Sequence, residues 1–385
     1  MFQRFEQALA QAVSNGRIAG GVALIADRDG VLYEHAAGVR AIGAAAPMDA
    51  ATVFWIASMT KAVVSVAALQ LVERGELTLD GDLTGLVPDF KDLQVLTPQG
   101  LRPAKRGPTL RQLLTHTSGF AYGFTSAELA AWIEASGFEA NGGTRASLRQ
   151  PLLFDPGQGW IYGIGIDWAG LAVEAASGQR LDAYLREHIL APLAMPDTGF
   201  IGAPDRAART AGVHVRGPEG GLVQIPFGMP ADPEVLAGGA GLYSTARDYG
   251  RFLRMLLNGG ELEGVRVLSG ETVRGLSQVQ TGERRAGYIR SAMANMSNDF
   301  DLYPQMATGH GLATMVTPQA TAEGRGPGSL AWGGLANTYY WADPAAGKAG
   351  VLLTQLLPFG DPEVLALMRA LERDAYGTPW PTMVS

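Results

Sequence analysis

The chain has 385 residues, of which 47% are apolar and 17% charged; this balance excludes a disordered chain, and the length allows two or three domains. A formal net charge of −7 and the absence of any run of lysines and arginines argue against a nucleic-acid partner. Because the chain has no cysteine, disulfide bonds, thiol catalysis and cysteine-based metal sites are excluded as well.

The first predicted element is an amphipathic helix at the N-terminus, which places Phe2, Phe5, Leu9 and Val13 on one face. This segment lacks the continuous apolar stretch of a signal peptide. The longest apolar run, around residues 62–72, is too short to span a bilayer. We therefore expect a soluble, cytoplasmic protein without a membrane partner.

A predicted β-hairpin follows, with strands at residues 22–26 and 31–35 and turn residues between them. A long apolar helix then begins near Ser58 and ends before Gly75, a typical helix-terminating glycine.

The middle of the chain, residues 77–230, has the pattern of short helices among loops, and strand character returns at residues 335–357 before a C-terminal helix at 361–377. If the strands of both ends pair, they form one sheet, and the middle is an inserted helical domain. This pattern predicts an α+β fold with a sheet flanked by helices. The predicted domains are an α/β domain of residues 1–76 and 236–385 and a mostly helical domain of residues 77–235, with the active site between them.

The segment FWIASMTKAVVSV, residues 54–66, contains one of only four lysines in a chain with 26 arginines. In a helix, Ser58 and Lys61 lie on the same face, three residues apart. The positive potential at a helix N-terminus favours an anionic serine oxygen and disfavours a charged lysine, and burial acts in the same direction. A neutral lysine can accept the serine proton and so activate a nucleophile.

A simpler interpretation is that Ser58 caps the helix and Lys61 is a solvated first-turn side chain. Two observations favour catalysis: a cation is electrostatically wrong for a first helical turn, and the residues that follow are of a buried type. None of the fifteen serines lies in a G-x-S-x-G motif, which excludes the usual nucleophile elbow. The five histidines have no metal-ligand spacing, and His116, in LLTHTSGF, is more readily a structural residue.

Four ordered motifs resemble the signatures of the serine β-lactamase and penicillin-binding-protein superfamily, in particular its class C-like esterase branch, the family VIII carboxylesterases. The resemblance covers residues 52–355. It implies a β-lactamase/transpeptidase-like fold with an antiparallel sheet. The motifs are Ser58-Met59-Thr60-Lys61, LLTHTSG at residues 113–119, DPGQGWIYGIGIDWAG at residues 155–170, and Trp332-Gly333-Gly334.

The resemblance also implies roles by position. Ser58 would be the acylated nucleophile, Lys61 its proton partner, and Tyr162 a proton shuttle whose hydroxyl lies close to the serine. The backbone N–H groups of Ser58 and Leu335 would form the oxyanion hole. Trp332, Gly333 and Gly334 would border the substrate, and Tyr122, Phe120 and Trp160 are further candidates for the substrate pocket.

Two departures from the family pattern point to esters. Relatives that act on peptides or β-lactams carry an asparagine where this chain has Ile164, and a lysine where it has Trp332. Losing an amide contact and a cation favours an apolar ester substrate. We therefore expect a serine carboxylesterase for short to medium acyl esters that needs no metal or cofactor. The alternatives are a β-lactamase or D-Ala-peptide hydrolase, an acyltransferase to a specific alcohol, and a non-enzymatic binding protein. The oligomeric state is left open.

Overall fold

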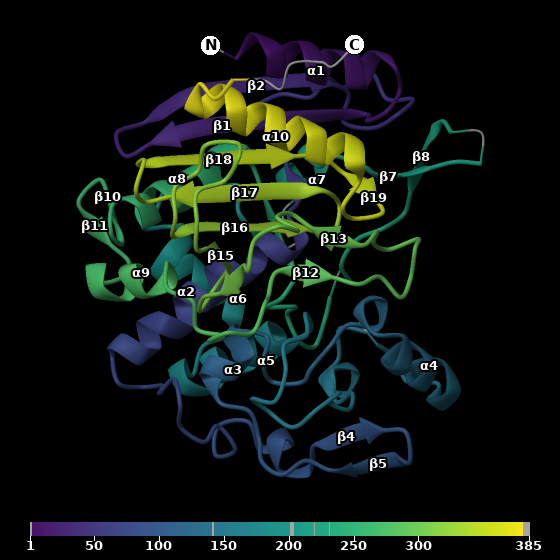
Figure 1. Cartoon of the computed structure of the whole chain (residues 1–385), viewed down its shortest axis with the longest axis vertical. Helices are drawn as coiled ribbons and strands as arrows, with labels where there is room; N and C mark the ends of the chain where they lie inside the picture. The colour runs from purple at the N-terminus through teal and green to yellow at the C-terminus, as the bar shows by residue number, and fades with distance from the viewer. Residues whose placement is uncertain (1, 141, 201–203, 219, 231, 380–385) are drawn as a thin grey trace.

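The computed structural model describes every residue except 1, 141, 201–203, 219, 231 and 380–385 (Figure 1). Its largest element is a seven-stranded antiparallel sheet in the order β14-β15-β16-β17-β18-β1-β2. The strands from the two ends of the chain therefore pair in one sheet, with Val22 opposite Leu353. The strands are β1 (Gly20–Asp27), β2 (Val31–Gly38), β14 (Gly309–His310), β15 (Met315–Thr317), β16 (Ser329–Gly334), β17 (Thr338–Asp343) and β18 (Lys348–Leu353).

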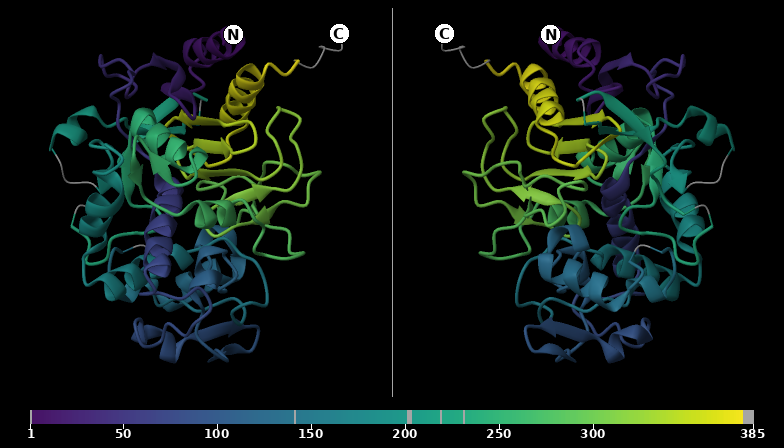
Figure 2. Two further views of the ribbon diagram at one scale, coloured as in Figure 1. Left: turned by 90° about the vertical axis from the view of Figure 1, so that its left-hand side faces the viewer. Right: turned by 90° about the vertical axis from the view of Figure 1, so that its right-hand side faces the viewer.

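Helices cover both faces of this sheet (Figures 1 and 2). A side chain at Gly21 would contact Leu9 of α1 (Gln3–Ser14), whereas Gly250 of α8 (Ala246–Leu257) packs against Leu24. Positions 21 and 24 of a strand point to opposite faces, so α1 and α8 lie on opposite sides. The C-terminal helix α10 (Pro362–Tyr376) packs beside α1. The predicted α+β class, with an antiparallel sheet flanked by helices, is confirmed.

The central helix of the molecule is α2 (Thr60–Glu73), which follows the short helix η1 (Ala57–Met59). Every residue from Thr60 to Leu71 is buried. A helix that is apolar on all sides belongs in the middle of a core, and α2 packs against α5 (Gly165–Ser177) of the helical region.

The remaining elements form the helical region and the connections to the sheet. Within the described ranges, none of the helices is long and apolar enough to cross a bilayer. The helices are α3 (Leu110–Leu114), α4 (Ala127–Ser136), α6 (Leu181–Leu185), α7 (Pro204–Arg209) and α9 (Gly270–Leu276), with short helices η2 (Pro88–Asp92), η3 (Gly123–Thr125), η4 (Ala146–Leu148) and η5 (Arg186–Leu190). The strands are β3 (Phe54–Trp55), β4 (Gln94–Thr97), β5 (Gly100–Pro103), β6 (Gly199–Phe200), β7 (Val213–Arg216), β8 (Leu222–Ile225), β9 (Leu242–Ser244), β10 (Glu261–Leu262), β11 (Val265–Arg266), β12 (Tyr288–Ile289), β13 (Phe300–Asp301) and β19 (Leu356–Leu357).

The division into residues 1–76 with 236–385 and residues 77–235 stays a prediction. Pairing between strands crosses its second boundary, because β7 pairs with β19 and β6 pairs with β9.

Candidate active site

Ser58 lies at the point where the chain turns from strand β3 into helix α2. The preceding residue, Ala57, has φ +43°, a left-handed conformation that is uncommon for a residue other than glycine. Strand β16 approaches this turn closely, since a Cβ atom at Gly334 would lie 2.2 Å from the carbonyl oxygen of Ile56. Gly334 therefore lets the sheet pack against the backbone that carries Ser58, and the substrate contact expected of it stays a prediction.

Lys61 is buried, with 1% of its surface exposed, and its Nζ contacts three oxygen atoms. It donates hydrogen bonds to Ser58 Oγ at 3.1 Å, to Tyr122 Oη at 2.9 Å and to the carbonyl oxygen of Gly239 at 2.8 Å. A carbonyl oxygen can only accept, so a neutral Lys61 keeps an N–H on Gly239 and can direct its lone pair to one of the two hydroxyls. The geometry suits transfer of the Ser58 proton to Lys61.

Tyr122, in the loop before η3, is the phenol that hydrogen-bonds to Lys61. Burial, and then the nearby carboxyl of Asp167, raise the pKa of Tyr122 well above its ordinary value. Tyr122 is therefore a neutral phenol at physiological pH, and a neutral phenol is a poor base. Of the two groups that hydrogen-bond to one another here, Lys61 is therefore better suited than Tyr122 to accept a proton from Ser58.

Tyr162 lies beside Tyr122, and its ring also contacts the amino group of Lys61. Its ring centre is 4.7 Å from Lys61 Nζ, within the range of a cation–π contact, and its hydroxyl accepts a hydrogen bond from Trp332 Nε1 at 3.1 Å. Tyr162, Trp332 and Ser58 together line a small cavity next to β16. Lys61 thus has the rings of both Tyr162 and Tyr122 as neighbours, and it hydrogen-bonds to the hydroxyl of Tyr122.

Leu335, whose amide is the second predicted oxyanion donor, begins the turn between β16 and β17. This turn is held by Asn337, which is buried, has φ +57° and makes four hydrogen bonds with its amide group. Its Nδ2 donates to the carbonyl oxygens of Leu356 and Pro358, and its Oδ1 accepts from Tyr339 and from the backbone of Asp361. These bonds use the full capacity of a carboxamide.

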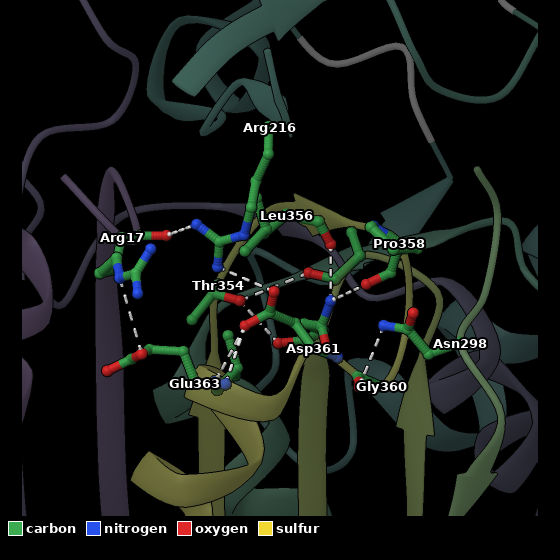
Figure 3. Close-up of polar contacts among 12 residues, drawn as sticks. Arg17, Arg216, Asn298, Thr354, Leu356, Pro358, Gly360, Asp361 and Glu363 are labelled. Carbon is green, nitrogen blue, oxygen red and sulfur yellow. Dashed lines mark hydrogen bonds and ion pairs between the residues drawn. The ribbon is translucent and has the colours of Figure 1, made fainter. Parts of the chain in front are cut away.

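Asp361 continues this network toward the surface (Figure 3). Its carboxylate caps α10 by accepting from the backbone N–H of Glu363, and it forms an ion pair with Arg216 at 2.8 Å. The turn that carries Leu335 is therefore tied to β7 and α10.

A second, larger cavity of about 320 Å³ opens beside Ser58. We call it the main cavity. Its lining is predominantly apolar, with Asp167 of α5 as its carboxyl group. The other lining residues that bear on the argument are Trp55, Ser58, Tyr122, Phe124, Leu148, Ile164, Phe227, Met229, Val235 and Leu335.

A model of the β-lactamase family matches residues 5–375, almost the whole chain. The chain belongs to the β-lactamase family. It is a serine hydrolase of that family, and the predicted resemblance and the predicted β-lactamase/transpeptidase-like fold are confirmed.

Curated relatives in this family include both hydrolases and transferases. Lovastatin esterase of Penicillium rubens is 32% identical over 389 residues, which cover 95% of this chain and 96% of the relative. Acyltransferase calJ of Penicillium decumbens is 32% identical over 366 residues, which cover 89% of this chain and 85% of the relative. The solved structure of unliganded simvastatin synthase from Aspergillus terreus superimposes with a TM-score of 0.81 at 30% identity, covering 98% of each chain.

Of the predicted pocket residues of this β-lactamase-family chain, Phe120 lies in the core, whereas Trp160 is half-buried and packs against the core. Phe120 is fully buried and stacks on Trp168 with ring centres 5.8 Å apart. Trp160 packs against Tyr288 and the two buried histidines of this region, His116 and His310. Of the other predicted residues, Gly333 and Trp332 line the small cavity and Tyr122 lines the main cavity.

His116 has φ +59°, and its ring packs against the ring of Tyr162, with ring centres 4.8 Å apart. Its Nδ1 accepts a hydrogen bond from the backbone of Gly163 at 3.4 Å, which fits the structural interpretation.

Sequence reasoning missed the contacts that Lys61 makes with residues outside the motif Ser58-Met59-Thr60-Lys61. Tyr122 was expected in the substrate pocket, and neither Asp167 nor Gly239 was singled out. Asp167 lies five residues after Tyr162, within the DPGQGWIYGIGIDWAG motif, and an acidic residue in the first turn of an apolar helix is the signal that could have identified it. Gly239 acts through its peptide group, which leaves no mark in a sequence.

Proposed function

We propose that the protein is a carboxylesterase that hydrolyses short to medium acyl esters through a covalent acyl-enzyme on Ser58. The observation that carries the proposal is the 3.1 Å contact between Lys61 Nζ and Ser58 Oγ next to a predominantly apolar cavity. An activated serine beside an apolar cavity is suited to an ester whose acyl or alcohol part is apolar.

The proposed reaction begins when Ser58 Oγ attacks the ester carbonyl carbon and its proton passes to Lys61. The oxyanion of the tetrahedral intermediate is stabilised by the backbone N–H groups of Ser58 and Leu335, donors that are typically worth about 3 kcal/mol each. The alcohol leaves with a proton supplied from Lys61 through Tyr162, which lines the small cavity next to Ser58. Water then attacks the acyl-enzyme, and the acid and the free Ser58 hydroxyl are restored.

The surroundings of Ser58 favour esters over β-lactams. Ile164, which replaces the amide of β-lactam-hydrolysing relatives, lines the main cavity. Trp332, which replaces their lysine, uses its Nε1 on Tyr162 and offers no cation to a substrate carboxylate. The carboxyl of Asp167 in the same cavity is a further obstacle to an anionic substrate.

Acyl transfer is the second candidate, because relatives about as similar as lovastatin esterase are named as acyltransferases. In that reaction an alcohol takes the place of water in the second half. A cavity of about 320 Å³ offers room for an apolar alcohol. The two functions share the acyl-enzyme on Ser58 and differ only in the acceptor.

The experiment that tests the proposal is intact-mass labelling with a fluorophosphonate, together with turnover of p-nitrophenyl esters. We expect one adduct on the wild type and neither adduct nor turnover with Ser58→Ala. The matched control is Ser65→Ala, which removes a buried hydroxyl from the same helix and should keep both signals. Full esterase activity in Ser58→Ala would contradict the mechanism.

Two comparisons separate the alternatives. Turnover of a chromogenic cephalosporin much faster than of a p-nitrophenyl ester would identify a β-lactamase. A strong preference for one added alcohol over water, measured by ester product against free acid, would identify an acyltransferase.

A further inference from the structure

Asp167 is a buried carboxyl group that the proposed mechanism does not use. It lies in the first turn of α5, where the helix dipole favours a negative charge, and 5% of its surface is exposed. Its Oδ1 accepts a hydrogen bond from the backbone N–H of Gly239 at 3.0 Å. The carbonyl oxygen of the same residue accepts from Lys61 Nζ at 2.8 Å. Asp167 and Lys61 are therefore connected through the two polar groups of Gly239.

The space around Gly239 shows how closely these groups are packed. A Cβ atom at this position would lie 2.4 Å from Asp167 Oδ2 and 3.1 Å from Tyr122 Oη. Only a residue without a side chain fits between the carboxyl and the phenol. Across this glycine, Asp167 faces Lys61 of α2 and Tyr122 of the loop before η3.

The charge of Asp167 affects the proton transfer from Ser58 to Lys61. When Ser58 gives up its proton, Lys61 becomes a buried ammonium ion, and a buried cation without a counter-charge is costly. Burial raises the pKa of Asp167, while the charge of Lys61 and the N–H of Gly239 act in the opposite direction. An ionised Asp167 stabilises the ammonium form of Lys61 as the aspartate of a Ser-His-Asp triad stabilises its imidazolium.

We propose that Asp167 is a positioning residue for the acylation step, which fixes Lys61 through Gly239 and supplies the counter-charge for the ammonium ion formed there. This inference rests on the proposed function, because it assigns Asp167 a role in the proton transfer from Ser58 to Lys61. Asp167 exchanges no proton with the substrate and forms no bond to it.

The test is Asp167→Asn, which keeps an oxygen for the N–H of Gly239 and removes the charge. The matched control is Glu174→Gln on the same helix, where a half-buried carboxyl accepts from the backbone of Leu181. The measurements are kcat and KM for p-nitrophenyl ester hydrolysis and the rate of fluorophosphonate labelling, both across pH.

With Asp167→Asn we expect kcat to fall about tenfold or more with KM nearly unchanged, and the labelling rate to fall in parallel. The acid limb of both pH profiles should move to lower pH by about one unit, because an opposite charge within reach typically shifts a titration by that much or more. Glu174→Gln should behave as the wild type. A merely structural role for Asp167 would lower activity without moving the acid limb.

Wild-type rates in Asp167→Asn, or lower rates with an unmoved acid limb, would overturn the inference. If Asp167→Asn gives no folded protein, Asp167→Ser is smaller, creates no clash and carries the same two expectations. Absence of labelling and turnover in the wild type would instead overturn the proposed function itself, so the two failures are distinguishable.

Discussion

Lys61 Nζ lies 2.9 Å from the hydroxyl of Tyr122 and 4.7 Å from the ring centre of Tyr162. The ring centre of Tyr122 also lies 5.1 Å from Nζ, so both tyrosines present a ring to Lys61, and Tyr122 adds the hydrogen bond of its hydroxyl. Their rings are neighbours, with centres 5.4 Å apart. The hydroxyl of Tyr122 hydrogen-bonds to Lys61, whereas the hydroxyl of Tyr162 accepts from Trp332, and Tyr162 lines the small cavity next to Ser58.

The first prediction concerns the removal of each hydroxyl in turn. Tyr122→Phe should lower kcat/KM by about tenfold to a hundredfold, the value of one hydrogen bond to a charged group. Tyr162→Phe should cost more, about 10²-fold to 10⁴-fold, because it removes a proton donor to the leaving alcohol. Steady-state kinetics with p-nitrophenyl esters measures both. If kcat/KM fell further in Tyr122→Phe than in Tyr162→Phe, Tyr122 and not Tyr162 would be the proton donor to the leaving alcohol.

The second prediction concerns the turn that carries Leu335. Asn337→Asp has nearly the same shape but loses both donors to the carbonyl oxygens of Leu356 and Pro358. We expect the Leu335 amide to lose its fixed position, and kcat to fall by about tenfold or more with a smaller change in KM, as for an interaction made in the transition state.

Kinetics of this variant should be compared with those of Asn298→Asp, which alters a neighbouring contact to the carbonyl of Gly360 (Figure 3). Equal kcat values for wild type and Asn337→Asp would show that the turn carrying Leu335 does not need the hydrogen bonds donated by Asn337.

Part of this site could be predicted because some of its residues are close together in the sequence. Ser58 and Lys61 are three residues apart on one helix, so their contact follows from helix geometry. The α+β class could be predicted because β-branched and aromatic residues mark the strands near both ends of the chain. Phe120 was expected in the pocket because aromatic residues occur both in pockets and in cores, and its packing on Trp168 depends on α5, a distant segment. The contacts of Lys61 with Tyr122 and Gly239 join residues 61 and 178 positions apart, and no local pattern encodes such pairings.

The third prediction concerns pH and stability. His310 is buried and donates from Nδ1 to the carbonyl oxygen of Gly311 at 2.7 Å, with His116 at a ring distance of 5.0 Å. Burial lowers the pKa of His310 from 6.5 to about 4. The unfolded chain therefore binds a proton between these values and the folded protein does not, so the free energy of unfolding falls as pH falls through this window. The loss from this residue is on the order of 3 kcal/mol.

Two carboxyls act in the opposite direction, since burial raises the pKa of Glu372 to about 7 and that of Asp248 to about 6. Their effect cancels when the wild type is compared with His310→Asn, because both proteins contain the two carboxyls. The amide of the introduced asparagine keeps a hydrogen-bond donor for the carbonyl oxygen of Gly311. Urea unfolding from pH 7.5 to 4.5 should show a smaller loss of stability in His310→Asn. Parallel curves for the two proteins would contradict the assignment.

The fourth prediction concerns substrate size. Phe227 and Trp55 line the main cavity and pack against one another with ring centres 5.5 Å apart. Phe227→Ala removes an apolar wall, and burial of such a side chain is worth about 1.5 to 3 kcal/mol. The value of kcat/KM should therefore fall about tenfold or more for an ester whose long chain occupies this cavity. Esters too small to reach Phe227 should be hydrolysed at nearly the wild-type rate.

Two substrate series decide which half of the ester lies there: p-nitrophenyl acetate against p-nitrophenyl hexanoate, and ethyl acetate against hexyl acetate. A loss confined to the hexanoate places the acyl chain in the main cavity, and a loss confined to hexyl acetate places the alcohol there. The control is Phe138→Ala, which removes a phenyl ring that packs on Trp132 at 5.3 Å, away from the main cavity. An equal loss for long and short esters in Phe227→Ala would mean that the main cavity does not hold the substrate chain, because a binding wall can act only on groups that reach it.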